Sequence, residues 1–115
     1  MGQIGIRSVN ATILNGQALS AEVAFGDRVP VGLVVPAAFD GTALTFQVST
    51  DGGTTWSEFY DASGNEVTVT VAPGRYIYLD PTVWIGVNDI KVRSGTAAMP
   101  TNQTSDRVLT FVTRY

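Results

Sequence analysis

Apolar and polar residues alternate with a period of two along much of the chain, the pattern of β-strands whose two faces meet different environments. The alternation is clearest at residues 44–49, where Leu, Phe and Val alternate with Thr, Gln and Ser. It recurs at 67–71 and 90–93, and in weaker form at 19–25. No segment repeats its apolar residues with the 3.6-residue period of a helix. These positions predict half-buried strands of an antiparallel sheet.

Two further segments, 29–35 and 108–112, are apolar on both faces, which is typical of central strands. Segments 56–60 and 75–79 complete a set of about eight strands. Turn-forming residues separate these runs at Gly26-Asp27, Asp40-Gly41, Asp51-Gly52-Gly53, Ser63-Gly64-Asn65 and Pro73-Gly74. We therefore predict an all-β fold, a single antiparallel β-sandwich that is jelly-roll-like.

Two stretches depart from this spacing. The first is weakly patterned and polar, so residues 1–18 are predicted to form an N-terminal arm or edge segment, followed by the β-sandwich domain at 19–115. The second is a long loop of small and polar residues at 95–105, just before the last strand. A loop of that length in a compact domain is typically mobile or in contact with a partner.

Composition narrows the chemistry. The 115 residues include neither cysteine nor histidine, which excludes thiolate and imidazole catalysis, Ser-His-Asp triads and Cys/His zinc sites. Seven scattered basic residues against ten acidic ones give a net charge of -3, which argues against a nucleic-acid partner. Because no apolar run approaches the length of a membrane span or a signal peptide core, we expect a soluble protein made in the cytoplasm without membrane association.

The segment Ser49–Trp56 has the spacing of the Asp-box of sialidases and related β-propellers. The chain is too short for the four or more blades of a propeller, so the segment predicts a β-hairpin turn. Asp51, with Asp61, could supply oxygen ligands to a hard cation, but an Asp that caps its own turn is the favoured interpretation. We therefore predict no metal and no cofactor.

Aromatic and acidic residues are the remaining candidates for a site. Trp56, Tyr60, Tyr76, Tyr78 and Trp84 could stack on sugar rings if at least two were exposed on one face. The neighbouring acids Glu58 and Asp61, or Asp80 and Asp89, would have to face each other across about 5–10 Å to act as a glycosidase pair. We expect these acids to be solvated and the protein not to be an enzyme. The side chains predicted to contact a partner or a glycan are Trp56, Tyr60, Trp84, Met99 and Pro100.

A wider resemblance covers roughly residues 19–114. The chain resembles small structural proteins of tailed bacteriophages and prophages in the segments 34–39, 44–52, 59–61, 64–67, 75–81 and 90–98. The resemblance implies a virion protein on the capsid exterior, most simply a decoration or cement protein. Its implied partners are the major capsid protein and copies of itself, with a trimer expected. Residues 1–18 would add strand contacts to a neighbour or to the shell.

Two alternatives stay open. The segment 84–93 faintly resembles the later strands of discoidin-like sugar-binding domains, so a carbohydrate-binding module that holds host-surface glycans is the first. A small tail or neck component is the second.

Overall fold

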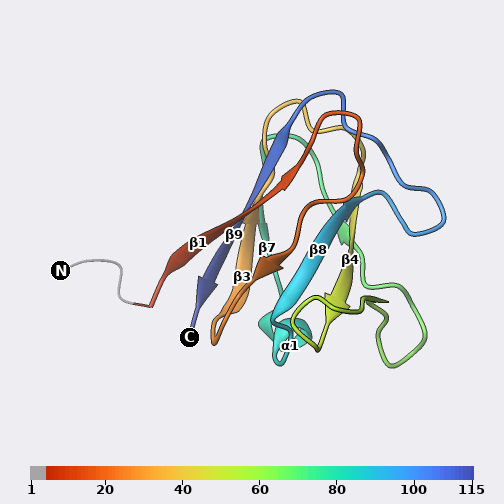
Figure 1. The fold of residues 1–115 in the computed structure, drawn as a ribbon. Coiled ribbons are helices and arrows are strands. Elements are labelled where there is room, and N and C mark those ends of the chain that lie inside the picture. The colour runs from red at the N-terminus through yellow and green to blue at the C-terminus, as the bar shows by residue number, and fades with distance from the viewer. Residues whose placement is uncertain (1–4) are drawn as a thin grey trace.

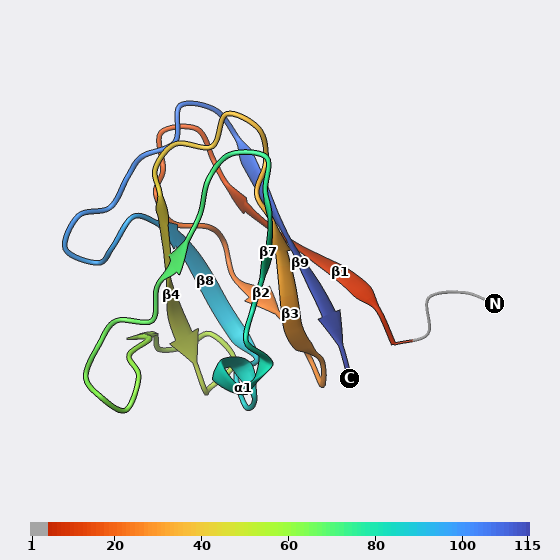
Figure 2. The same cartoon turned by 180° about the vertical axis from the view of Figure 1, so that it is seen from behind.

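Two antiparallel sheets packed face to face make up the computed structural model, which describes residues 5–115 (Figures 1 and 2). Sheet A has the order β1-β9-β3-β7, and sheet B the order β2-β8-β4-β5 with β6 pairing along another part of β4. Sheet A consists of β1 (Arg7–Ile13), β9 (Arg107–Arg114), β3 (Val29–Val34) and β7 (Tyr76–Tyr78). Sheet B consists of β2 (Val23–Ala24), β8 (Asp89–Ser94), β4 (Ala43–Ser49), β5 (Ser57–Glu58) and β6 (Val69–Thr70).

The predicted all-β antiparallel sandwich is confirmed. Strands far apart in sequence are neighbours in each sheet, since β1 pairs with β9 and β2 with β8. The strands β3 and β9 are central within sheet A, as their apolar sequences indicated. Their outward residues Val34 and Val108 are exposed. Within residues 5–115, sheet A is covered on its inner face alone.

Strand β1 lies at the edge of sheet A and falls within residues 1–18, the segment whose sequence is weakly patterned. It pairs with β9 over all seven of its residues, from Arg7 opposite Thr113 to Ile13 opposite Arg107. Ala11 and Ile13 are fully buried, because every second residue of the strand faces the core. Residues 1–4 of the predicted segment lie outside the described residues.

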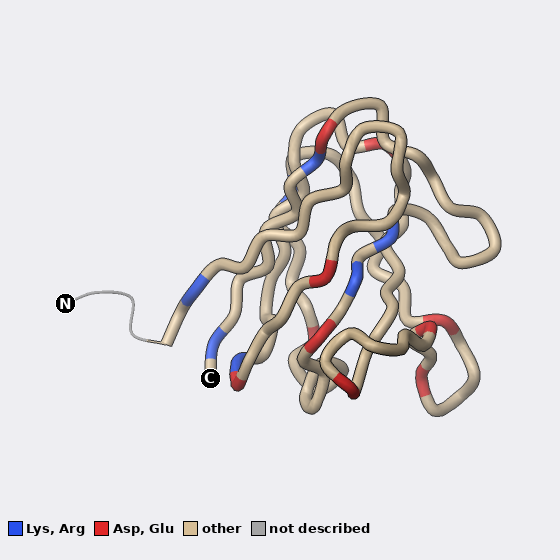
Figure 3. The backbone as a smooth tube through the Cα atoms, viewed as in Figure 1, with Lys and Arg blue, Asp and Glu red and all other residues tan. Residues whose placement is uncertain are grey.

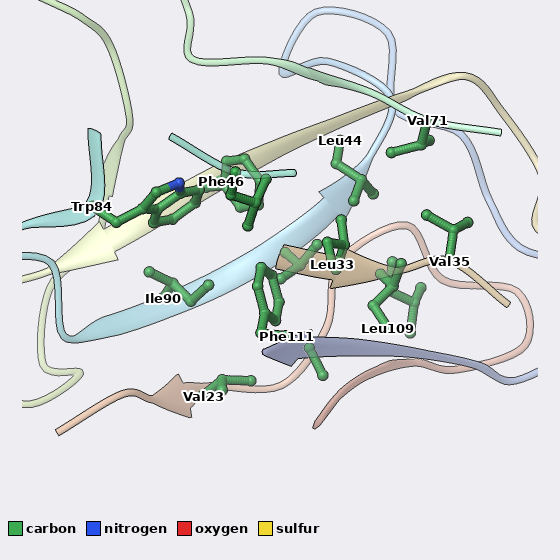
Figure 4. Packing of buried hydrophobic residues seen from close by; sticks show 14 of the residues in the cluster. Val23, Leu33, Val35, Leu44, Phe46, Val71, Trp84, Ile90, Leu109 and Phe111 are labelled. Carbon is green, nitrogen blue, oxygen red and sulfur yellow. The ribbon is translucent and has the colours of Figure 1, made fainter. Parts of the chain in front are cut away.

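Trp84, which the short helix α1 (Pro81–Trp84) delivers, packs into the core between the sheets beside Phe46 (Figure 4). The sequence did not predict this helix, which is a single turn. Asp80 is its N-cap, because the Asp80 carboxylate accepts a hydrogen bond from the Thr82 amide, and Pro81 is the first helical residue. Trp84 makes edge-to-face contacts with four phenylalanines, at ring-centroid distances from 4.8 to 6.3 Å: Phe25, Phe46, Phe59 and Phe111.

The loop at 95–105 is held in place by the rest of the chain. The buried Gln103 side chain accepts a hydrogen bond from the Asp40 amide and donates one to the Asp40 carbonyl, while its backbone bonds to Gly16 and Gln17. The Asp40 carboxylate accepts hydrogen bonds from the amide and the hydroxyl of Thr104. These bonds keep the pKa of Asp40 below its ordinary value, chiefly through the Thr104 amide.

Candidate interaction surface

The turn at Ser49–Trp56 is closed by its own side chains. The Asp51 carboxylate accepts hydrogen bonds from the Thr55 amide at 2.9 Å, the Thr55 hydroxyl at 2.6 Å and the Ser49 hydroxyl at 2.8 Å. These bonds, led by the one from the Thr55 hydroxyl, lower the pKa of Asp51 from 3.8 to about 2. The turn is therefore a self-capped hairpin turn, in agreement with the favoured interpretation of the sequence.

Most of the other candidate acids also have structural roles. Asp61 accepts hydrogen bonds from the amides of Ser63 and Asn65, and Asp80 caps α1. Glu58 forms a bidentate ion pair with Arg93, in which the two guanidinium nitrogens Nη1 and Nη2 donate to the two carboxylate oxygens at 2.8 and 3.0 Å. Within residues 5–115, no three acidic side chains gather in a way that could hold a metal ion.

The two tryptophans offer little to a ligand. Trp84 is only 2% exposed, so the prediction that it contacts a partner or a glycan is wrong: its ring fills the core. Trp56 is half-buried, with the Lys91 ammonium 4.7 Å from its ring centroid and its indole N–H bonded to the Gly53 carbonyl. The backbone of Tyr60 forms a β-bridge with Glu66, and the Tyr60 side chain is exposed.

Met99 and Pro100 lie at the exposed tip of the 95–105 loop, and the Met99 side chain is 77% exposed. The tip is a tight turn in which the Thr96 amide donates to the Met99 carbonyl and the Thr96 hydroxyl accepts from the Met99 amide. The Ala97 amide donates to the Glu66 carboxylate at 3.1 Å, which ties the tip to the segment between β5 and β6. These two predicted contact residues are thus accessible and held in a defined turn.

The outer face of sheet B carries charged side chains that bind one another. Arg93 is buried and reaches Glu58, Glu66 at 3.5 Å and the Thr45 hydroxyl at 3.3 Å. Gln47, opposite Glu58 in the ladder, donates a further hydrogen bond to it. The pKa of Glu58 lies below its ordinary value, mainly because of the hydrogen bonds from Arg93. This face is occupied by its own ion pairs.

The outer face of sheet A differs in kind. Its residues alternate with core residues along four strands, and among those that the structure describes only Arg114, at one end, is charged. They are Ser8, Asn10, Thr12, Gly32, Val34, Tyr76, Tyr78, Val108, Thr110, Val112 and Arg114. The basic residues of β1 and β9 all lie at the ends of these strands (Figure 3). An uncharged sheet face with exposed aromatic rings is the arrangement of a contact surface.

Two tyrosines of β7 dominate this face. Tyr78 is 73% exposed, and the Tyr76 ring lies across Gly32 of β3, at the place where a side chain on residue 32 would stand. The sequence placed both tyrosines on one face but did not include them among the five expected contacts. Their alternation with the inward residues Ile77 and Leu79 was the available signal.

No protein family, no curated protein and no solved structure matches this chain. None of the described helices is long and apolar enough to cross a membrane. The described part of the surface contains no enclosed pocket. The assignment of function therefore rests on the outer face of sheet A.

Proposed function

We propose that the protein is a non-enzymatic structural protein of a tailed-phage virion that decorates the capsid exterior and stabilises the head through protein–protein contacts. The phage setting comes from the resemblance of the sequence to small virion proteins. The single observation that carries the mode of action is the uncharged outer face of sheet A, with Val34, Tyr76 and Tyr78 exposed on it. The partner is the major capsid protein, with copies of the chain beside one another on the shell.

Physical chemistry supports contact through this face. Tyrosine is enriched and Lys, Glu and Asp are depleted in the cores of protein interfaces, because charges are costly to desolvate. A tyrosine buries a large area while immobilising few rotatable bonds. The Tyr76 ring is already packed across Gly32, so less conformational entropy is lost when a partner covers it.

The test introduces one charge on each outer face. Val34→Lys places an ammonium between Tyr76 and Thr110 on sheet A, and the matched control Ala24→Lys places the same charge on an exposed strand of sheet B. Occupancy on purified particles, measured by quantitative mass spectrometry, should fall at least about tenfold for Val34→Lys, since a desolvated charge costs well over 1.4 kcal/mol. Ala24→Lys should retain full occupancy.

Counting copies of the chain per particle separates the positions within the virion. Hundreds of copies support decoration of the head, whereas about six or twelve copies support the alternative of a neck or tail component. Absence of the chain from purified particles overturns the virion assignment altogether.

A carbohydrate-binding module on the particle is the second candidate, favoured by the exposure of Tyr76 and Tyr78 on one face. Two exposed rings satisfy the condition for stacking on a sugar. Glycan-array binding that is lost in Tyr78→Ala and kept in Tyr78→Phe would support this function. Full capsid occupancy in both variants would then separate glycan binding from decoration.

A further inference from the structure

Strand β1 is a long edge with nothing paired to its outer side among the described residues (Figures 1 and 2). The other strands at sheet edges, namely β7, β2, β5 and β6, have only two or three residues each. Strand β1 has seven, and it contains neither proline nor a bulge. Proteins normally shorten or interrupt such edges, because free N–H and C=O groups recruit other strands.

At every second residue of β1, the backbone N–H and C=O groups point outward from the edge of the sheet. The Arg7 carbonyl accepts a hydrogen bond from the Thr113 hydroxyl of β9, and the Asn15 amide, eight residues on, donates to Asp106 on the same side. Because backbone groups alternate in direction along a strand, those of Ser8, Asn10 and Thr12 face outward from the edge. A second strand could pair with all three residues.

We propose that β1 pairs antiparallel with β1 of a second copy of this chain, about a twofold axis through Asn10. In this register the residue numbers of each facing pair add up to 20. Asn10 meets Asn10 of the second copy, and Ser8 meets its Thr12. All three outward-facing residues then form hydrogen-bonded pairs, and the two A sheets become one continuous sheet.

The side chains fit this register. Ile6 and Leu14, which flank β1, are 41% and 56% exposed, and the twofold pairing places the Ile6 of each copy opposite the Leu14 of the other. The one charged residue of the strand, Arg7, lies opposite Ile13, so no like charges oppose each other. Self-pairing therefore covers exposed apolar area at both ends of the strand.

This inference does not depend on the proposed function, because it concerns the free protein in solution. Residues 1–18 were expected to form an arm or an edge segment; within them β1 is an edge strand, and the proposed pairing gives it a twofold contact between copies. The uncharged outer faces of sheet A would then extend across the axis as one surface.

Sedimentation equilibrium of the full chain, from about 1 µM to about 1 mM, measures the dimer dissociation constant. We choose this concentration range because the interface is smaller than the standard size of roughly 1,600 Å². Asn10→Lys and Asn10→Asp each place two like charges opposite each other across the axis. Each homodimer should be about fivefold weaker or more than the wild-type dimer, given a cross-strand repulsion near 1 kcal/mol. An equimolar mixture should form a heterodimer that is at least about fivefold tighter than either homodimer.

Thr70→Lys is the control, because it adds the same charge to an exposed strand residue on β6, which belongs to the other sheet and contacts neither Asn10 nor β1. Its dissociation constant should change by less than about twofold at 0.15 M salt, where surface charges are screened beyond roughly 8 Å. Circular dichroism melting checks that each variant folds. A wild-type chain that stays monomeric at about 1 mM overturns the proposal, and so does a mixture of the two Asn10 variants that dimerises no better than either alone.

Discussion

The outer faces of the two sheets are made from similar lengths of strand but are used differently. On sheet B, Arg93, Glu58 and Glu66 bind one another and fasten neighbouring loops to the sheet. On sheet A, the corresponding positions hold Thr, Val and Tyr side chains with few bonds among them beyond the 3.0 Å contact of Thr110 with Asn10. One face thus carries internal ion pairs, while the other is the face that we propose for contact with a partner.

The difference has an energetic basis. The buried guanidinium of Arg93 loses its water, and that loss is offset only if carboxylates and hydroxyls replace the water molecules. Glu58, Glu66 and Thr45 do so. Substitutions on sheet B should therefore change the free energy of unfolding, whereas substitutions on the outer face of sheet A should change association.

The largest expected effect is on sheet B, for Arg93→Met. The methionine keeps much of the side-chain volume but leaves Glu58 and Glu66 without their cation. Breaking a fully buried pair costs about 3–5 kcal/mol, and we expect about 2 kcal/mol here because Glu58 is partly exposed. Urea unfolding measures the change.

Adding Glu58→Gln to the Arg93→Met variant provides the control. Removing the orphaned carboxylate should recover part of the lost stability, which a double-mutant cycle detects as non-additivity. Additive losses would mean that the ion pair does not stabilise this face.

The next effect is local and depends on pH. The folded-state pKa values of Asp51, Glu58 and Asp40 all lie below their ordinary values, so each carboxylate stabilises the fold above about pH 4.5. That contribution should be lost as the pH falls from about 4.5 to 2, and hydrogen exchange at pH 3 should rise first at 49–66 and 95–105. Carboxyl NMR should give a midpoint near 2 for Asp51.

Thr55→Val tests the cause, because the Thr55 hydroxyl makes the largest contribution to the lowered pKa of Asp51. The midpoint should move toward 3.8 in this variant. An unchanged midpoint would show that the turn holds the charge of Asp51 in some other way. The uncharged middle of sheet A should keep its exchange rates over the same pH range.

Period-two alternation was enough to predict the sandwich and the strands β4 and β8, because Leu44 and Phe46 of β4 and Ile90 and Val92 of β8 alternate with polar residues and are fully buried. The turn at Asp51 was also predictable, since its bonds are local. Trp84 was not, because a one-turn helix capped by Asp80 turns an apparent surface aromatic into a buried core residue. The seven-residue strand β1 was not predicted, because its residues are weakly patterned. The contrast between the two outer faces depends on cross-strand register, which a single sequence leaves open.

A smaller effect is expected for Gly32→Ala on sheet A. The new methyl group would overlap the Tyr76 ring, which is free to swing away because it is exposed. Lost packing and the reduced entropy of the unfolded chain should nearly cancel, leaving the free energy of unfolding within about 0.5 kcal/mol of wild type. The Tyr76 ring resonances should shift nonetheless, and capsid occupancy should fall. Unshifted resonances would show that the ring does not lie across residue 32.

The smallest effect on stability should come from Tyr78→Ser, at the most exposed tyrosine of the outer face. Little of its ring is buried by the chain itself, so the change should alter stability by less than about 0.5 kcal/mol and the melting temperature by no more than roughly 2–4 °C. Capsid occupancy, in contrast, should fall clearly, because the ring contributes its area only when a partner covers it. A large drop in melting temperature with unchanged occupancy would contradict the comparison between the two faces. Tyr78 would then stabilise the folded chain instead of contacting a partner.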